Sequence, residues 1–215
     1  DVSMNQLSGS VPASVSALAQ VTSLNLHNNQ LTGFIPAEIG NMTKLVILDL
    51  AYNQLYGSIP STLTQLSQLA YLSLVANQLS GPIPADIGVL TKLSFLALSR
   101  NQLSGSIPVS VSALVQLTLL YLYENQLTGS VPAKTGSMRN LVTLSLRDNE
   151  LTGSIPAEIG NMTKLVFLSL AFNQLYGSIP STLTQLTQLT FLSLPNNELT
   201  SSIPAEIGNM TKLVI

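Results

Sequence analysis

An asparagine recurs along this chain at a fixed interval of 24 residues. It stands at nine positions, with no insertion or deletion between them: Asn5, Asn29, Asn53, Asn77, Asn101, Asn125, Asn149, Asn173 and Asn197. Around each asparagine the sequence follows one pattern, and residues 45–60 are a complete copy of it: L-x-x-L-x-L-x-x-N-x-L-x-G-x-I-P. A strict period of this size predicts stacked units that each pack mainly on their neighbours. We therefore expect one solenoid domain over residues 1–215, with about nine units.

The leucines of each unit predict a β-strand at its start. Residues 45–50 contain Leu45, Leu48 and Leu50. The segment ends in the alternation of period two that is typical of a half-buried strand. Copies of this strand in successive units then lie parallel and roughly 4.8 Å apart, so that their leucines form one continuous core. Asn53 follows the strand, where its amide can bond backbone groups that the turn leaves unpaired. We expect these asparagines to form a ladder inside the coil.

The second half of each unit predicts a turn, an extended segment and a short helical turn. Gly57 belongs to a column of glycines, which are suited to positive φ, and the column ends at Ser201, where we expect a distorted turn. Ile59 and Pro60 recur as Ile or Val before Pro, and proline favours an extended conformation in the preceding residue. Apolar side chains spaced by three in residues 37–45 predict a short helical or 3₁₀ turn on the outer side. Because that side is wider, we expect the stack to curve, with the main strands on its concave face.

The composition argues against several kinds of partner. Only 8% of the residues are charged and the net charge is −2, so the sequence lacks the basic stripe that nucleic acid requires. The lysines and arginines are dispersed, which gives no basic patch for an anionic membrane. No apolar run approaches the roughly 18 residues of a transmembrane helix. We expect neither nucleic acid nor a membrane to be a partner of this segment.

Catalytic and metal-binding patterns are also missing from the sequence. There is no cysteine and His27 is the single histidine, so no thiolate site, histidine cluster or catalytic base pair can be assembled. No phosphate-binding glycine loop, zinc-ligand spacing or nucleophile elbow occurs. One column of acidic residues faces water on the outer side beside lysines: Glu38, Asp86, Glu158 and Glu206. We predict a protein that is not an enzyme and that uses no metal and no cofactor.

The repeat pattern resembles that of the plant-type leucine-rich repeat family. The family consensus L-x-x-L-x-L-x-x-N-x-L-x-G-x-I-P matches nearly all of residues 1–215. The resemblance implies an α/β solenoid, a curved right-handed superhelix with a parallel β-sheet on its concave face and short 3₁₀ turns on its convex face. The family includes receptor-kinase ectodomains, receptor-like proteins, glycosidase inhibitors of the polygalacturonase-inhibitor type and ice-binding relatives.

The two ends of the sequence depart from the family pattern. Asp1 begins and Ile215 ends within an expected strand, and no cysteine-containing cap flanks either end. Uncapped ends expose core leucines and strand edges. We therefore expect a fragment of a longer chain that lacks its terminal caps. Where the family has a kinase domain, that domain lies outside such a fragment.

The exposed positions of the main strands are where the units differ from one another. One column reads Ser23, Ile47, Tyr71, Phe95, Leu119, Thr143, Phe167 and Phe191. Large apolar side chains on an open face mark interaction surfaces, and Tyr and Arg dominate binding hot spots. We predict a ligand-binding surface on the concave face, formed by Tyr71, Phe95, Arg100, Tyr121, Tyr123, Glu124, Arg147, Asp148, Phe167, Phe172 and Phe191.

Packing within the sheet is the alternative explanation of these side chains. Aromatic residues on neighbouring strands stabilise a sheet surface, and Arg100 and Glu124 can pair across adjacent strands. A second observation favours binding. Residues 37–74 and 157–194 are nearly identical at an offset of 120 residues, and almost all their differences fall on exposed strand positions. Drift at unburied positions would give a similar pattern.

Three N-x-T triplets occupy one register on the expected convex side. They are Asn41-Met42-Thr43, Asn161-Met162-Thr163 and Asn209-Met210-Thr211. Such triplets accept N-linked glycans in the secretory pathway. Because the surrounding unit was duplicated, the three copies count as one observation. We predict glycosylation at Asn41, Asn161 and Asn209 if the protein is secreted.

The leading hypothesis is an extracellular or cell-surface recognition module. It would be part of a receptor-like or secreted defence or signalling protein, and its concave face would bind a protein, peptide or glycan. A structural or ice-binding protein is the first alternative, because charge is low and Ser and Thr are regularly spaced. Tyr56 and Tyr176 interrupt the column that would form a flat threonine array. A glycosidase inhibitor is the second alternative and belongs to the same binding class.

Overall fold

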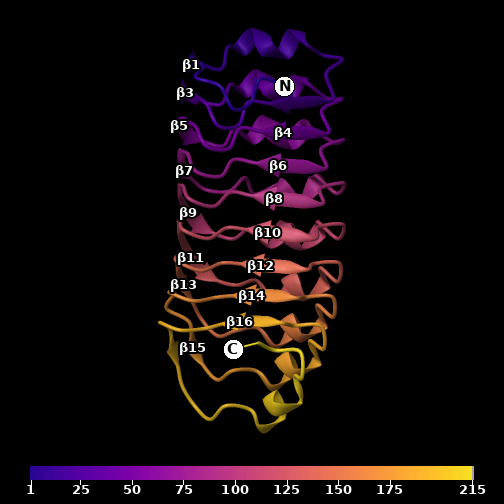
Figure 1. Cartoon of the computed structure of the whole chain (residues 1–215), viewed down its shortest axis with the longest axis vertical. Helices are drawn as coiled ribbons and strands as arrows, with labels where there is room; N and C mark the ends of the chain where they lie inside the picture. Colours follow the sequence, from indigo (N-terminus) through magenta and orange to yellow (C-terminus); the bar gives the residue numbers. More distant parts are fainter. Residues whose placement is uncertain (215) are drawn as a thin grey trace.

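The computed structural model describes residues 1–214 and shows a stack of parallel coils (Figure 1). Two ladders of β-strands run along the stack. In Figure 1 the strands labelled β4 to β16 are stacked down the centre, and those labelled β1 to β15 follow the left-hand edge. The predicted solenoid is therefore confirmed.

The first ladder is an eight-stranded parallel sheet, which we call the concave sheet. Each strand has three residues and pairs with the equivalent residues of the next unit, as Leu48 does with Leu72. Its strands are β2 (Ser23–Asn25), β4 (Ile47–Asp49), β6 (Tyr71–Ser73), β8 (Phe95–Ala97), β10 (Leu119–Tyr121), β12 (Thr143–Ser145), β14 (Phe167–Ser169) and β16 (Phe191–Ser193).

The second ladder consists of what we call the lateral strands, which follow the asparagine of each unit. Residues that pair between neighbouring lateral strands, such as Ser8 and Gln30, are 22 positions apart in the sequence and not 24. Each lateral strand therefore pairs two residues out of step with the 24-residue repeat. The strands are β1 (Ser8–Ser10), β3 (Gln30–Gly33), β5 (Gln54–Ser58), β7 (Gln78–Gly81), β9 (Gln102–Ser106), β11 (Gln126–Ser130) and β13 (Glu150–Thr152), then a separate pair, β15 (Tyr176–Gly177) and β17 (Glu198–Leu199). This is the predicted second extended segment.

Short 3₁₀ turns cover the opposite, convex side. They are η1 (Ala13–Ala17), η2 (Ala37–Asn41), η3 (Ser61–Gln65), η4 (Ile87–Val89), η5 (Val109–Ala113), η6 (Ala133–Ser137), η7 (Ala157–Asn161), η8 (Ser181–Gln185) and η9 (Ala205–Asn209). A proline precedes each turn directly, except that η4 begins after Asp86. Proline suits this place because it lacks the N–H that the first turn of a helix leaves unpaired.

The core lies between the concave sheet, the lateral strands and the 3₁₀ turns. Within one unit, five leucines are fully buried: Leu48 of β4, Leu45 and Leu50 on either side of that strand, Leu55 of β5 and Leu63 of η3. The same positions of successive units form one contiguous cluster along the stack. Because every unit contributes to the same core, removal of one side chain affects the packing of both neighbouring units.

The predicted asparagine ladder is present and joins each unit to the one before it. Asn53 Nδ2 donates to the carbonyls of Leu26 and Leu50 at 3.0 and 3.1 Å. Its Oδ1 accepts the backbone N–H of Leu31 at 3.0 Å. Corresponding bonds form at the other asparagines from Asn29 to Asn197. Each side chain thereby satisfies backbone groups of its own turn and of the preceding coil, which would otherwise be buried without partners.

Two backbone positions of each unit adopt the left-handed conformation. Glycine occupies the first, as in Gly57 with a φ of 79°. Ser201 keeps a φ of 72° at this position, so the distortion that we expected there does not occur at this residue. The second position directly precedes the asparagine and carries other residues, such as Tyr52 and Arg100 with φ values of 54° and 57°. Nothing in the sequence pattern predicted this second position, because such residues disfavour positive φ.

The 3₁₀ turns are of two kinds. Some carry Ser or Thr at their fourth residue, and the hydroxyl donates to the first carbonyl of the same turn, as Thr64 does to Ser61 at 2.7 Å. Others carry glycine at the equivalent position of the repeat. In three of these turns, the carbonyl three residues before the glycine accepts a hydroxyl from the next unit, as Ala37 does from Thr62 at 2.6 Å. We call these hydroxyl turns and glycine turns. The hydroxyl turns contain Ser16, Thr64, Ser112 and Thr184, and the glycine turns contain Gly40, Gly88, Gly136, Gly160 and Gly208.

The glycine turns allow the next unit to approach closely. A Cβ placed on Gly40 would lie 2.4 Å from the backbone oxygen of Thr62. The same crowding occurs at the glycine turns up to Gly160. Gly208 of the last unit has no such neighbour within 4 Å. These turns therefore need glycine for close backbone approach and not for positive φ.

We predict that Gly40→Ala lowers the free energy of unfolding by about 1–3 kcal/mol, because the new methyl group forces two convex turns apart. The matched control is Gly208→Ala, which meets no neighbouring atom and should leave stability unchanged or slightly raised, since alanine favours helical turns. Urea unfolding followed by circular dichroism measures both variants. Equal stability of Gly40→Ala and the parent protein would contradict this account of the glycine turns.

Candidate functional site

The exposed column of the concave sheet contains two stacked pairs of aromatic rings. Tyr71 and Phe95 lie with ring centroids 4.3 Å apart and planes 9° from parallel. Phe167 and Phe191 lie 4.4 Å apart at 4°. Parallel strands in register place equivalent side chains about 4.8 Å apart, so rings with the same rotamer stack face to face. The packing alternative weighed from the sequence therefore describes a real contact, and it leaves the ring edges open to solvent.

The first pair belongs to a larger group that we call the aromatic cluster, consisting of Tyr71, Phe95, Tyr121 and Tyr123. The rings of Phe95 and Tyr121 lie 6.0 Å apart, and those of Tyr121 and Tyr123 lie 6.2 Å apart at a right angle. The cluster borders a hollow of about 350 Å³ in the concave face, which we call the concave hollow. Burial raises the pKa values of the Tyr71 and Tyr123 phenols above their ordinary value.

The N-terminal wall of the concave hollow is polar. His27, Asp49 and Tyr52 line it together with the aromatic cluster. Asp49 Oδ1 accepts the backbone N–H of Ala51 at 3.1 Å, and Tyr71 donates its hydroxyl to Oδ2 at 3.4 Å. The Asp49 carboxylate also helps to raise the pKa of Tyr71. His27 Nδ1 lies 2.7 Å from Oδ1 of Asn25 and 3.8 Å from Asp49 Oδ2.

A second group, the charged cluster, lies beyond Tyr123 and consists of Arg100, Glu124, Arg147 and Asp148. Arg100 Nε and an Arg147 terminal nitrogen bond the two Glu124 oxygens at 3.0 and 2.6 Å. Arg147 also bonds Asp148 at 2.5 Å, and its guanidinium lies 4.9 Å from the Tyr123 ring centre. The hydrogen bond to Glu124 raises the pKa of Arg100. Because the two positive and two negative groups pair with one another, the cluster adds no net charge to the concave face.

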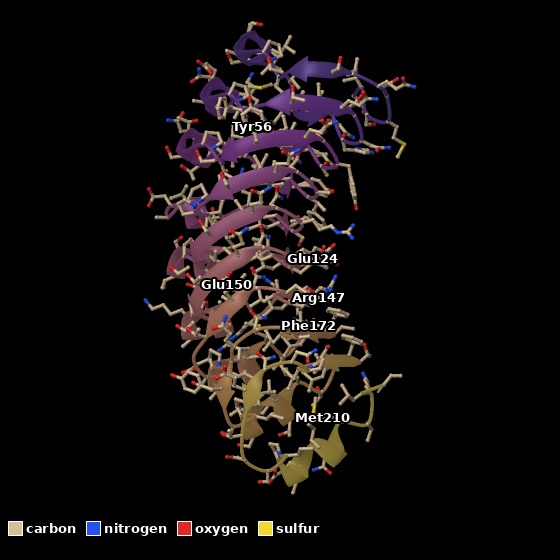
Figure 2. The ribbon with its side chains drawn as sticks, turned by 90° about the vertical axis from the view of Figure 1, so that its left-hand side faces the viewer. Tyr56, Glu124, Arg147, Glu150, Phe172 and Met210 are labelled. Carbon is tan, nitrogen blue, oxygen red and sulfur yellow. The ribbon has the colours of Figure 1, made fainter. Side chains whose placement is uncertain are left out.

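The remaining candidates lie further along the stack. Phe167 and Phe191 form the second stacked pair, and Phe172 is 50% exposed at the position before an asparagine. In Figure 2, Glu124, Arg147 and Phe172 lie along one side of the stack, whereas Tyr56 and Glu150 of the lateral strands lie toward the other. The eleven candidates thus fall into three sets: the aromatic cluster at the concave hollow, the charged cluster beyond it, and the phenylalanines further along the stack.

Seven of the residues that line the concave hollow were not among the sequence candidates, and three of these seven have large polar side chains: His27, Asp49 and Tyr52. Each occupies the same repeat position as a residue that was selected. His27 corresponds to Tyr123, Asp49 to Tyr121, and Tyr52 to Arg100. Extending the selection along each column would have included them.

The predicted glycosylation sites lie on the convex side. Asn41, Asn161 and Asn209 are exposed at the ends of η2, η7 and η9. A larger, shallow hollow of about 960 Å³ lies near the C-terminal end, beside the interruption between β13 and β15. Serines, prolines and Tyr176 line it, together with the carboxylates of Glu158 and Glu206.

Within residues 1–214, no group of three or more His, Cys, Asp and Glu side chains is placed to hold a metal ion. Over the same residues, no helix has the length and apolarity needed to cross a bilayer.

Solved structures resemble the chain over almost its whole length. The plant peptide hormone receptor RGFR1, in complex with RGF2, is 40% identical with a TM-score of 0.96, over 97% of this chain and 34% of that one. The ectodomain of the Arabidopsis receptor kinase HAESA, in complex with an IDA peptide hormone ligand, is 38% identical with a TM-score of 0.92, over 99% and 36%. A plant ice-binding protein is 29% identical with a TM-score of 0.78, over 95% and 74%.

Family models match as well. A model described as a leucine-rich repeat region covers residues 48–175, and one described as a Leucine Rich Repeat covers residues 20–42 and 188–210. A comparison with curated protein sequences found no significant match. The chain belongs to the leucine-rich repeat family, in its plant-type form. It spans about a third of the length of the two receptor chains.

We predict that the stacked pair stabilises the sheet. A double-mutant cycle with Tyr71→Ala and Phe95→Ala should give a coupling free energy of about 0.5–1.5 kcal/mol, because stacked rings interact beyond their buried area. Urea unfolding of the single and double variants measures it. The combination of Tyr71→Ala with Phe191→Ala is the control and should be additive, since those rings belong to different pairs. A coupling near zero for Tyr71 and Phe95 would show that the stacking does not contribute to stability.

Proposed function

We propose that this segment is an extracellular recognition module that binds a peptide, or an extended segment of a protein, on its concave face. The observation that carries the proposal is the aromatic cluster around the concave hollow, on an otherwise weakly charged sheet. Apolar and aromatic walls with a few placed polar groups are the usual lining of a ligand site. We assign no catalytic role to any of these residues.

The comparisons support a peptide as the ligand. The structures of RGFR1 with RGF2 and of HAESA with IDA are both complexes of a receptor ectodomain with a peptide hormone. The present chain matches part of each receptor, so its role as the ligand-binding part of a longer protein is included in the proposal. The extracellular location rests on the same relatives.

The geometry of the sheet favours recognition through side chains. The inner strands of the concave sheet already pair on both sides, so a peptide cannot join them as a further strand. Phe95 of the aromatic cluster and Phe167 of the second pair are three units apart, roughly 14 Å at the usual strand spacing. About four extended residues would span that distance.

The ring arrangement favours a peptide over a glycan. A sugar ring binds against the open face of an aromatic ring, and stacking halves the faces available here, because Tyr71 and Phe95 each cover one face of the other, as do Phe167 and Phe191. Ring edges and phenol hydroxyls remain for contact. Such surfaces suit the mixed apolar and polar groups of a peptide.

We expect Tyr121→Ala and Tyr123→Ala to weaken peptide binding by more than tenfold each, because truncation of a hot-spot tyrosine costs about 2 kcal/mol or more. The probes are peptides selected from a phage-displayed random library on the parent protein, with affinities measured by calorimetry. Phe34→Ala is the matched control, an aromatic side chain that is 63% exposed outside the concave face. Selected peptides that bind both tyrosine variants as tightly as the parent, or that lose affinity only for Phe34→Ala, would refute concave binding.

Ice binding is a second candidate function, favoured by the similarity to the plant ice-binding protein. The lateral strands would supply its regular surface. Their outward column contains Thr32, Ser80, Ser104, Thr128 and Thr152 but also Tyr56 and Tyr176, which are 45% and 55% exposed. These tyrosines interrupt a flat array of small hydroxyl groups. An assay of ice recrystallisation decides between the two functions, because inhibition by the purified protein would favour this one.

We also propose N-linked glycans at Asn41, Asn161 and Asn209. Their convex location keeps glycans away from the concave face. In protein secreted from insect cells, Thr43→Ala should remove one glycan, measured as the loss of one glycan mass by intact mass spectrometry. Thr91→Ala is the matched control, since Thr91 holds the same repeat position but Val89 replaces the asparagine. An unglycosylated parent protein would refute the proposal.

A further inference from the structure

The concave hollow contains a carboxylate that its surroundings do not neutralise. Asp49 is the one carboxylate that lines the hollow, within the residues that the structure describes. Its side chain is 15% exposed, so the charge is partly withdrawn from water yet reachable from the hollow. Over residues 1–214, no lysine or arginine lies within ion-pair distance of it, and His27 is the nearest basic group at 3.8 Å.

The hydrogen bonds of Asp49 are also incomplete. Oδ1 is held by the backbone N–H of Ala51 at 3.1 Å, which fixes the orientation of the carboxylate. Oδ2 has only the 3.4 Å contact from the Tyr71 hydroxyl, which is long for an O–H···O bond. A carboxylate offers about four acceptor positions. At least one acceptor position of Oδ2 therefore remains for a donor in the hollow.

The arginines of the same face do not compensate this charge. Arg100 and Arg147 are engaged by Glu124 and Asp148, and neither arginine lines the concave hollow. With the charged cluster balanced internally, Asp49 gives this end of the concave face a negative centre. A partially enclosed site strengthens the attraction of such a centre for a positive group, because less water screens it.

The other walls suit the remainder of a basic side chain. Lysine and arginine have a long apolar stem below the charged group, and such stems lie along apolar surfaces. Phe95, Val75 and Ala97 offer such a surface, and the phenol oxygens of Tyr52, Tyr71 and Tyr121 can accept hydrogen bonds. One ring of the hollow already binds a guanidinium, since Arg147 lies 4.9 Å from the centre of Tyr123.

We propose that the concave hollow is a subsite for a basic side chain, lysine or arginine, of the peptide partner, and that Asp49 pairs with its charged group. This inference rests on the proposed peptide-binding function and adds the chemistry of one anchoring residue. Asp49 holds and orients the positive group, the backbone N–H of Ala51 fixes the carboxylate, and the aromatic cluster encloses the stem.

The test uses L-argininamide as a basic probe and L-citrullinamide as a probe of nearly the same shape without the positive side-chain charge. Binding is followed at pH 8 by amide chemical shifts of the isotopically labelled protein. Argininamide should shift resonances of residues that line the concave hollow, and citrullinamide should bind about tenfold more weakly, as expected for the loss of a charge-assisted hydrogen bond.

Asp49→Asn is the decisive variant because it keeps the shape and the acceptor for Ala51 but removes the charge. It should reduce argininamide binding to the citrullinamide level. Asp86→Asn, a carboxylate variant on the convex side, should bind argininamide as the parent does. Equal binding of the two probes, shifts centred on Glu124 and Asp148, or unchanged binding by Asp49→Asn would each overturn the subsite.

Failure of the subsite can be separated from failure of peptide binding. Peptides selected on the parent protein should be rich in lysine or arginine and lose about tenfold in affinity for Asp49→Asn. If they bind Asp49→Asn normally but lose affinity for Tyr123→Ala, the concave face binds peptides and the basic subsite is wrong. If they also bind Tyr123→Ala normally, the proposed function itself fails.

Discussion

The asparagine ladder is the interaction on which the rest of the structure depends. A solenoid must turn its backbone sharply inside the coil, where water cannot satisfy the polar groups, and an unpaired buried group costs about 1–3 kcal/mol. Asn53 and its equivalents meet this need by bonding carbonyls of two successive units and one backbone N–H. The residue before each asparagine is held at positive φ, although none of these residues is glycine. The ladder thus fixes the geometry of the turn and leaves the neighbouring side chains free to vary.

That freedom explains how a nearly uniform chain can present a distinctive surface. The leucines, asparagines and glycines repeat, while the exposed positions of the concave sheet carry rings, acids and arginines in only some units. Register between parallel strands brings side chains from different units to about 5 Å of one another. The stacked rings and the charged cluster arise in this way, each across adjacent units. A site in such a protein is therefore an arrangement of neighbours along a column and not a local motif.

The sequence predicts most of this fold because a fixed period defines which residues become neighbours. The main strands, the asparagine ladder, the 3₁₀ turns and the exposed aromatic column all follow from that period. Other features depend on atomic distances that no pattern contains. The shift of the lateral strands by two residues depends on how far the chain advances through the turn. The position of the concave hollow depends on the lengths of side chains in several columns at once. Asp49 and Tyr52 therefore line the hollow, whereas the candidate Phe172 does not.

The two kinds of convex turn have a consequence for how repeat units can be added to such a chain. Hydroxyl turns and glycine turns alternate from Ser16 to Gly136, so the structural period on the convex side is two units and not one. The duplicated segments 37–74 and 157–194 are offset by 120 residues, which is five units, an odd number. An odd offset cannot preserve a two-unit alternation. The break falls at Gly136 and Gly160, where two glycine turns follow one another and Glu158 supplies no hydroxyl for the carbonyl of Ala133. The junction between η6 and η7 therefore interrupts the two-unit alternation of the convex side, and an array built only from pairs of units would have no such junction.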